Sequence, residues 1–156
     1  MKRNVLYSFA FIAILLISTS TAFTQSRGEY DIYQRVNRER SKFRLGTLAW
    51  DDRLAQLARD YSRKMAREGF FGHYDRSGLA VEDRAIAARI KNWSVIGENL
   101  FFCEDHPTYV DTAVTGWMKS PTHRENILDR EFTTTGIGIA TARDGSIFVT
   151  QVFTRN

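Results

Sequence analysis

Two of the three histidines, His73 and His123, lie in segments that could support chemistry. His73 follows Phe-Phe-Gly at 70–72, and His123 lies in the stretch 120–128. Between them, Glu98 has apolar residues on both sides, which predicts that its carboxylate is at least partly buried. A buried carboxylate requires a cation, a metal or several hydrogen-bond donors to offset its lost hydration.

The same residues also have purely structural interpretations. His73 could cap the end of a helix, and Glu98 could accept hydrogen bonds from backbone donors. Separations of 25 residues between positions 73, 98 and 123 do not show that the side chains meet. The third histidine, His106, precedes a proline in a polar loop and is expected to be exposed.

Four segments show the apolar spacing of helices, namely 29–43, 51–69, 81–90 and a stretch opened by Pro107. The second is the clearest, because Asp51 or Asp52 can cap its start and Gly69 can end it. After the fourth helix, Ser120 is placed to cap a short helical turn with proline in its first position. This arrangement puts His123 in the first turn.

The C-terminal part of the chain changes to the alternating pattern of strands. The predicted strands cover 136–142 and 146–153, joined by Arg-Asp-Gly at 143–145, a strong hairpin signal. Apolar residues of the second strand face both ways, with Ile147, Val149 and Phe153 opposite Phe148 and Val152. A sheet with two apolar faces must be covered on both. The prediction is an α+β fold, a three-layer α-β-α sandwich around a central antiparallel sheet.

Residues 1–22 have the layout of a secretory signal peptide. Lys2 and Arg3 precede an apolar run over 5–17, and small residues at Ser20 and Ala22 fit cleavage after position 22. This run is shorter than the roughly 20 residues that span a membrane, so cleavage is favoured over retention as an anchor. We expect a secreted, periplasmic or envelope location, with membrane attachment only through an uncleaved signal segment.

Removal of that segment leaves 134 of the 156 residues, the size of one domain. The remaining 20 basic and 18 acidic residues are interspersed and give a net charge of +2, so no nucleic acid partner is expected. Cys103 is the only cysteine, which excludes an intramolecular disulfide. Beside two phenylalanines, it is predicted to be a small buried apolar residue rather than a catalytic thiol.

Seven short motifs follow one another in a defined order. They are Val-Asn-Arg-Glu-Arg at 36–40, Leu-Ala-Trp-Asp at 48–51, Phe-Phe-Gly-His at 70–73, Gly-Glu-Asn-Leu at 97–100, Trp-Met-Lys-Ser-Pro-Thr-His-Arg-Glu-Asn-Ile-Leu at 117–128, Gly-Ile-Gly-Ile at 136–139 and Thr-Gln-Val-Phe at 150–153. Together they resemble the bacterial branch of the CAP superfamily (cysteine-rich secretory protein, antigen 5, pathogenesis-related 1). The resemblance predicts a CAP domain, also called SCP-like, over residues 29–155.

This resemblance implies an α-β-α sandwich with a cleft where histidines and acidic residues converge. The matching residues are His73, Glu98 and His123, which makes them the candidate metal ligands and the candidate catalytic residues. Two imidazoles and one carboxylate are the ligand types of an open site for zinc or another divalent metal. They could equally form a hydrogen-bonded cluster in which Glu98 fixes an imidazole tautomer.

The chain also departs from the family pattern. Eukaryotic members carry a second site glutamate on the helix where this sequence has Trp-Met-Lys-Ser at 117–120. Glu125 is close in sequence, but two residues beyond His123 on a helix it would point elsewhere. Glu125 is therefore not assigned to the site.

Three functions are compatible with these residues. The preferred one is a binding module for a lipid, a cell-wall glycan or a protein, because some relatives bind lipids and aromatic residues surround the motifs. The alternative is a metal-dependent hydrolase, a peptidase or esterase, in which Glu98 ligates the cation or serves as general base. The sequence lacks a His-Glu-x-x-His helix and a Gly-x-Ser-x-Gly elbow. In the third, the three residues only tie segments together.

Overall fold

The computed structural model describes residues 25–104 and 106–155, so the predicted signal peptide at 1–22 lies outside the described residues. The elements are α1 (Arg27–Lys42), β1 (Ala49–Trp50), α2 (Asp52–Glu68), α3 (Val81–Ala87), β2 (Val95–Cys103), α4 (Tyr109–Lys119), α5 (Pro121–Leu128), β3 (Thr134–Thr141) and β4 (Ile147–Arg155). The strands form one sheet in the order β1-β3-β4-β2.

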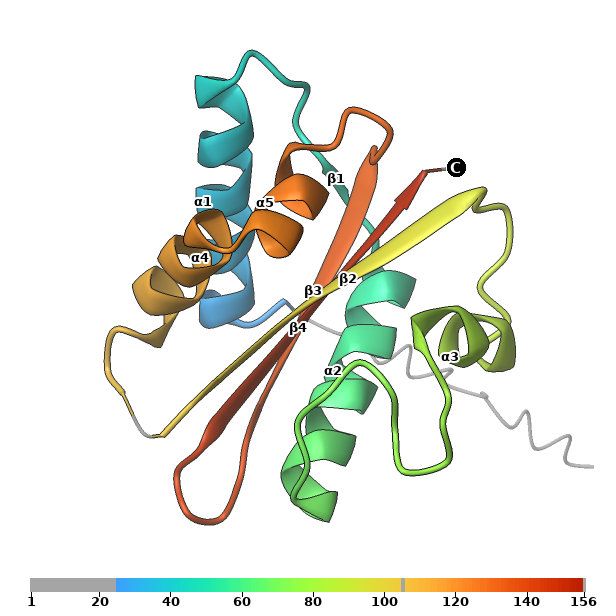
Figure 1. Cartoon of the computed structure of the whole chain (residues 1–156), viewed down its shortest axis with the longest axis vertical. Coiled ribbons are helices and arrows are strands. Elements are labelled where there is room, and N and C mark those ends of the chain that lie inside the picture. The colour runs from blue at the N-terminus through green and yellow to red at the C-terminus, as the bar shows by residue number, and fades with distance from the viewer. Residues whose placement is uncertain (1–24, 105, 156) are drawn as a thin grey trace, which may run out of the picture.

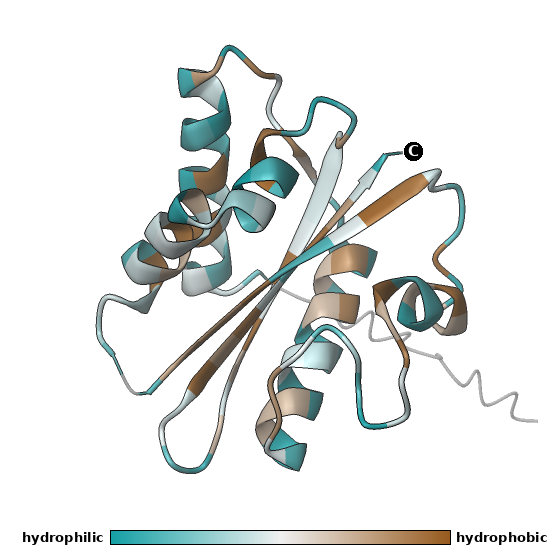
Figure 2. Ribbon diagram, in the orientation of Figure 1, coloured by the Kyte–Doolittle hydropathy of each residue, from teal (hydrophilic) through white to brown (hydrophobic). Residues whose placement is uncertain are grey.

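Helices cover both faces of this sheet (Figure 1). Helices α1, α4 and α5 lie on one face, and α2 and α3 lie on the other. Along β4, Ile147, Val149 and Phe153 join the first core, whereas Phe148 and Val152 pack on the α2 side. Figure 2 shows brown, hydrophobic stretches on strands and helices alike, whereas the hairpin loop between β3 and β4 is largely teal. The predicted three-layer α-β-α sandwich is confirmed.

The sheet is mixed rather than wholly antiparallel. Strands β2, β4 and β3 are antiparallel, as expected from the hairpin. The short β1 adds a parallel pairing with Thr134 and Thr135 of β3. Because β1 has only two residues, it carries no alternating pattern that the sequence could reveal.

Local capping sets the ends of α2. The Asp51 side chain accepts hydrogen bonds from two backbone N–H groups of the first turn, at 2.7 and 3.2 Å. Gly69, with φ of 63°, ends the helix in the left-handed conformation that glycine tolerates. Both predicted boundaries of α2 are confirmed.

Other helix boundaries differ by a few residues from the predicted ones. Helix α1 starts at Arg27 because Ser26 and Glu29 form a capping box. Helix α4 begins at Tyr109, after the proline expected to open it, and α3 ends at Ala87 rather than at residue 90. None of these shifts changes the layer in which a helix lies.

Helix α2 lies directly on β3 because two glycines of that strand present no side chain to it. A methyl group added at Gly136 would lie 2.1 Å from the Ala55 nitrogen. At Gly138 it would lie 2.0 Å from the Arg59 nitrogen. These are backbone atoms, so a larger residue could be accommodated only by moving the helix.

We therefore predict that Gly138→Ala lowers the free energy of unfolding by more than about 3 kcal/mol, because overpacking here displaces backbone. The matched control is Gly116→Ala on α4, where an added methyl group meets nothing within 4 Å. This control should raise stability by up to about 1 kcal/mol through helix propensity. Urea unfolding of both variants checks the expectation, and equal stabilities would contradict it.

Candidate functional site

Strand β2 lies at the edge of the sheet and carries the centre of the predicted site. Successive side chains of a strand point to opposite faces. Glu98 accordingly reaches residues of the α2 and α3 layer, while the amide of Asn99 reaches α5. The Glu98 side chain is 3% exposed, so its predicted burial is confirmed.

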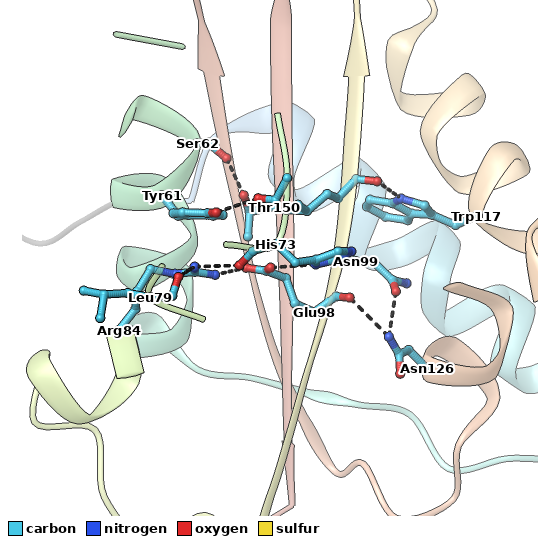
Figure 3. Close-up of polar contacts among 12 residues, drawn as sticks. Tyr61, Ser62, His73, Leu79, Arg84, Glu98, Asn99, Trp117, Asn126 and Thr150 are labelled. Atoms are coloured by element: carbon cyan, nitrogen blue, oxygen red, sulfur yellow. Dashed lines mark hydrogen bonds and ion pairs between the residues drawn. The ribbon is translucent and has the colours of Figure 1, made fainter. Parts of the chain in front are cut away.

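Two side chains engage the two carboxylate oxygens of Glu98 (Figure 3). His73 Nδ1 lies 2.9 Å from Oε1, and Arg84 Nη2 donates to Oε2. Arg84 comes from α3, and its side chain is 9% exposed. A buried carboxylate is tolerated when a cation and further hydrogen bonds replace its hydration. Arg84 is therefore the cation that the burial of Glu98 requires.

Arg84 is itself held by the loop that carries His73. Its Nη1 donates to the carbonyl oxygens of His73 and Leu79, both at 3.0 Å. The guanidinium carbon lies 3.3 Å from the ring centroid of Tyr61 on α2, a stacked cation–π contact. The Tyr61 hydroxyl donates to the Gly72 carbonyl at 2.5 Å. Burial raises the pKa of Tyr61 to about 12, so this hydroxyl remains a donor at neutral pH.

The loop between α2 and α3 takes its shape from Asp75. The Asp75 carboxylate accepts hydrogen bonds from the backbone N–H groups of Leu79 and Ser77, at 3.0 and 2.8 Å. These bonds, the one from Leu79 foremost, hold the pKa of Asp75 below its ordinary value. A carboxylate turn of this kind fixes the loop, and with it the position of His73.

His123 reaches the site from the opposite layer, in the first turn of α5. Ser120 is the N-cap residue and proline occupies the first helical position, as predicted. The Ser120 hydroxyl does not cap the helix; its Oγ lies 2.8 Å from His123 Nδ1. The Asn99 amide donates to the His123 carbonyl at 3.0 Å. The ring and the backbone of His123 are both positioned by these contacts.

Side chains of α4 and α5 bind the backbone of the edge strand. Asn126 donates to the Glu98 carbonyl at 3.2 Å and to the Asn99 side-chain oxygen at 2.9 Å. Trp117 Nε1 donates to the Leu100 carbonyl at 2.8 Å. An edge strand presents carbonyl groups that a neighbouring strand would otherwise bind. Helices α4 and α5 thereby protect this edge beside the site.

The two imidazoles lie close together, with ring centroids 6.4 Å apart and 33° between their planes. The predicted proximity of His73, Glu98 and His123 is confirmed, while their chemical roles stay predictions. Each ring uses Nδ1 for an internal contact. Within residues 25–104 and 106–155, neither Nε2 has a hydrogen bond. Because the His73 side chain is 51% exposed, solutes can reach it.

The charges of the site are balanced internally. The Arg84 guanidinium neutralises the Glu98 carboxylate at short range. Burial lowers the pKa of His123 below its ordinary value, and the neighbouring His73 adds to this shift. His123 is therefore neutral near pH 7 and can offer a ring nitrogen to a ligand.

The side chains of the site limit how a metal ion would be bound. Among the described residues, no group of three or more His, Cys, Asp or Glu side chains is arranged to hold a metal ion. Both Glu98 oxygens are already engaged, by His73 and by Arg84, so a cation at this carboxylate would compete with these two contacts. The two imidazole nitrogens Nε2 remain, and imidazole is a ligand that zinc favours. His73 and His123 thus offer two imidazole donors, one fewer than the three protein ligands of a catalytic zinc site.

Three other residues lie outside the site. Glu125 is exposed on α5 and takes no part in the contacts of Glu98. His106 is exposed as predicted, with Nδ1 3.0 Å from the Thr108 hydroxyl. Cys103 is half-buried against the core beneath α1, α4 and α5, which is less burial than its sequence context predicted.

Sequence reasoning did not identify three residues of the site. Arg84, Asn99 and Asn126 contact the predicted residues directly. The buried carboxylate indicated that some cation was needed, but no local signal pointed to Arg84. Asn99 and Asn126 stand within recognised motifs, where Asn126 was expected only to hydrogen-bond within its own loop.

Residues 33–153 match the model of the cysteine-rich secretory protein family, CAP. Because this match covers most of the chain, the protein belongs to that family. Among curated proteins it is similar to the membrane protein YlbC of Bacillus subtilis, with 30% identity over 117 residues, 74% of this chain and 32% of YlbC. It is 31% identical over 134 residues to YkwD of the same organism, covering 86% of this chain and 50% of YkwD.

Among solved structures, an extracellular protein containing an SCP domain from Bacillus anthracis is similar, with a TM-score of 0.71 and 29% identity. The match covers 83% of this chain and 40% of that one. The chain thus spans half or less of the length of each of these three proteins. In residues 25–104 and 106–155, no helix combines the length and apolar character needed to cross a membrane.

The lowered pKa of His123 predicts a pH dependence of stability. The folded protein binds a proton at His123 less readily than the unfolded chain does. The contribution of His123 to the free energy of unfolding is therefore fully present above about pH 6.5. It is lost as the pH falls through the folded pKa. Urea unfolding between about pH 7.5 and 5 should show a shallower decline for His123→Gln than for the wild type. The control is His106→Gln, which removes an exposed imidazole; identical slopes for wild type and His123→Gln would refute the expectation.

Proposed function

We propose that this chain is a secreted or envelope-associated binding module that holds its ligand at the site formed by His73 and His123. The supporting observation is the convergence of two imidazoles from opposite layers, each with Nδ1 bound internally and Nε2 left for an outside partner. Such preorganised rings bind without first losing side-chain freedom. The predicted signal peptide and the extracellular SCP-domain relative support the location.

A divalent cation such as zinc would be held by the Nε2 atoms of His73 and His123. Glu98 would then act behind His73, accepting its Nδ1–H and fixing the ring, as carboxylates do beside ligating histidines. The bound cation would supply a positive charge that attracts an anionic or carbonyl oxygen of the ligand. Two protein ligands leave coordination positions for that oxygen and for water.

Exposed aromatic side chains on the same side of the molecule as His73 favour an apolar or glycan ligand. Phe71 is 51% exposed and Phe102 is 42% exposed, with ring centroids 5.8 Å apart. They line a hollow of about 310 Å³ together with Gly69, Phe70, Ser146 and Phe148, among others. Phe102 shares a face of β2 with Glu98, four residues away, or about 13 Å along a strand. A ligand of that length could contact both the imidazoles and the rings.

The direct test is retention of ligand by the purified protein from a bacterial lipid extract and, separately, from solubilised cell-wall fragments. We expect one of these sources to supply a retained ligand identifiable by mass spectrometry. The double variant His73→Ala/His123→Ala should bind it at least about tenfold more weakly, on the order of 1.4 kcal/mol. Phe71→Ser/Phe102→Ser should also weaken retention.

The matched control is His106→Ala, which removes the exposed histidine that lies outside the site. It should retain the ligand as the wild type does. Absence of retained ligand from both sources, with the fold intact, would refute the proposal.

A hydrolase is the second candidate, because the contact between His73 Nδ1 and Glu98 has the form of a general base with its orienting carboxylate. As a binding module, the protein should show the same background rates in peptidase and esterase assays with and without the two histidines. A rate that disappears in His73→Ala/His123→Ala and persists in His106→Ala would instead favour the hydrolase.

A further inference from the structure

Arg84 contacts several parts of the structure around His73. Its guanidinium binds the Glu98 carboxylate, the carbonyl of His73 itself and the carbonyl of Leu79. It also stacks on the Tyr61 ring at 3.3 Å. Because its side chain is 9% exposed, Arg84 acts on a ligand through other residues rather than by direct contact.

The guanidinium controls which oxygen Glu98 offers to His73. With Nη2 bound to Oε2, the carboxylate presents Oε1 to the imidazole, where it lies 2.9 Å from Nδ1. The neighbouring Nη1 binds the backbone of the same histidine. The planar fork of arginine therefore fixes both ends of the contact, the carboxylate and the residue that donates to it.

This contact decides where the proton of a neutral His73 ring resides. An ionised carboxylate only accepts hydrogen bonds, so Oε1 requires the proton on Nδ1. The lone pair then lies on Nε2, the nitrogen without an internal partner. Since half of the His73 side chain is exposed, the ring would otherwise be free to adopt other rotamers or the other tautomer.

We propose that Arg84 is the positioning residue of the site, which holds Glu98 and the His73 backbone together and thereby fixes His73 as the Nδ1–H tautomer with Nε2 directed outward. The inference rests on the proposed function only in that Nε2 is the atom offered to a ligand. Arg84 Nε is buried and has no hydrogen-bond partner among the described residues. The contacts with Glu98 and the two carbonyls therefore set the orientation of the guanidinium, although its Nε–H donor is left without a partner.

The test is the tautomer of His73 in the ligand-free protein, read from long-range proton–nitrogen correlation spectra of the ¹⁵N-labelled chain. The spectra are recorded at about pH 8, above the ordinary imidazole pKa of about 6.5. His106→Gln and His123→Gln assign the three ring systems. The wild type should show His73 with its proton on Nδ1 alone.

Replacement of Arg84 should abolish this preference. In Arg84→Gln the single-tautomer pattern of His73 should give way to the averaged pattern of two tautomers. Arg84→Lys should not restore it, because one ammonium group cannot bind the carboxylate and both carbonyls while stacking on a ring. Arg76→Gln is the matched control. Arg76 lies in the loop that carries His73 and binds the carbonyls of Glu68 and Gly69, but it does not contact Glu98.

Two outcomes would overturn the proposal. A wild-type His73 with its proton on Nε2 would do so without any variant, even if Arg84→Gln failed to fold. A folded Arg84→Gln or Arg84→Lys with an unchanged tautomer would reduce Arg84 to a structural role, visible only as a lower melting temperature. A fixed tautomer in a protein that retains no ligand would support the role of Arg84 and refute the proposed function.

Discussion

The buried carboxylate of Glu98 is the constraint around which one side of the molecule is organised. A carboxylate with 3% exposure requires replacement of its hydration, which costs several kcal/mol if unmatched. The chain meets this requirement with the guanidinium of Arg84 and the imidazole of His73. Bringing them to β2 places α3 and the preceding loop over the strand, and the Tyr61 and Asp75 contacts hold that loop.

The position of β2 at the sheet edge explains how the second histidine arrives. An unprotected edge favours association with other chains, and here the carbonyls of Glu98 and Leu100 are bound by Asn126 and Trp117. These bonds hold α4 and α5 against the strand, and α5 carries His123. The contacts that protect the edge therefore also bring the two imidazoles together, one from each layer.

The layers could be predicted from the sequence because their signals are local. Apolar residues alternate on both faces of β4, and Asp51 and Gly69 mark the ends of α2. Strand β2 was not predicted, since its centre, Gly-Glu-Asn at 97–99, consists of residues disfavoured in strands. Arg84 could not be identified, because its role depends on a carboxylate fourteen residues away and nothing distinguishes it locally among 22 basic residues.

The site combines a neutralised carboxylate with two imidazoles whose outer nitrogens are available, and this arrangement supports the proposal that it holds a ligand. That is the central claim, and zinc tests it most directly as a probe. Crystals of the purified protein grown with zinc should give an anomalous difference peak bonded to Nε2 of both His73 and His123, with Glu98 still paired to Arg84. A peak bound only elsewhere, or rings that turn away from each other with zinc present, would contradict the claim.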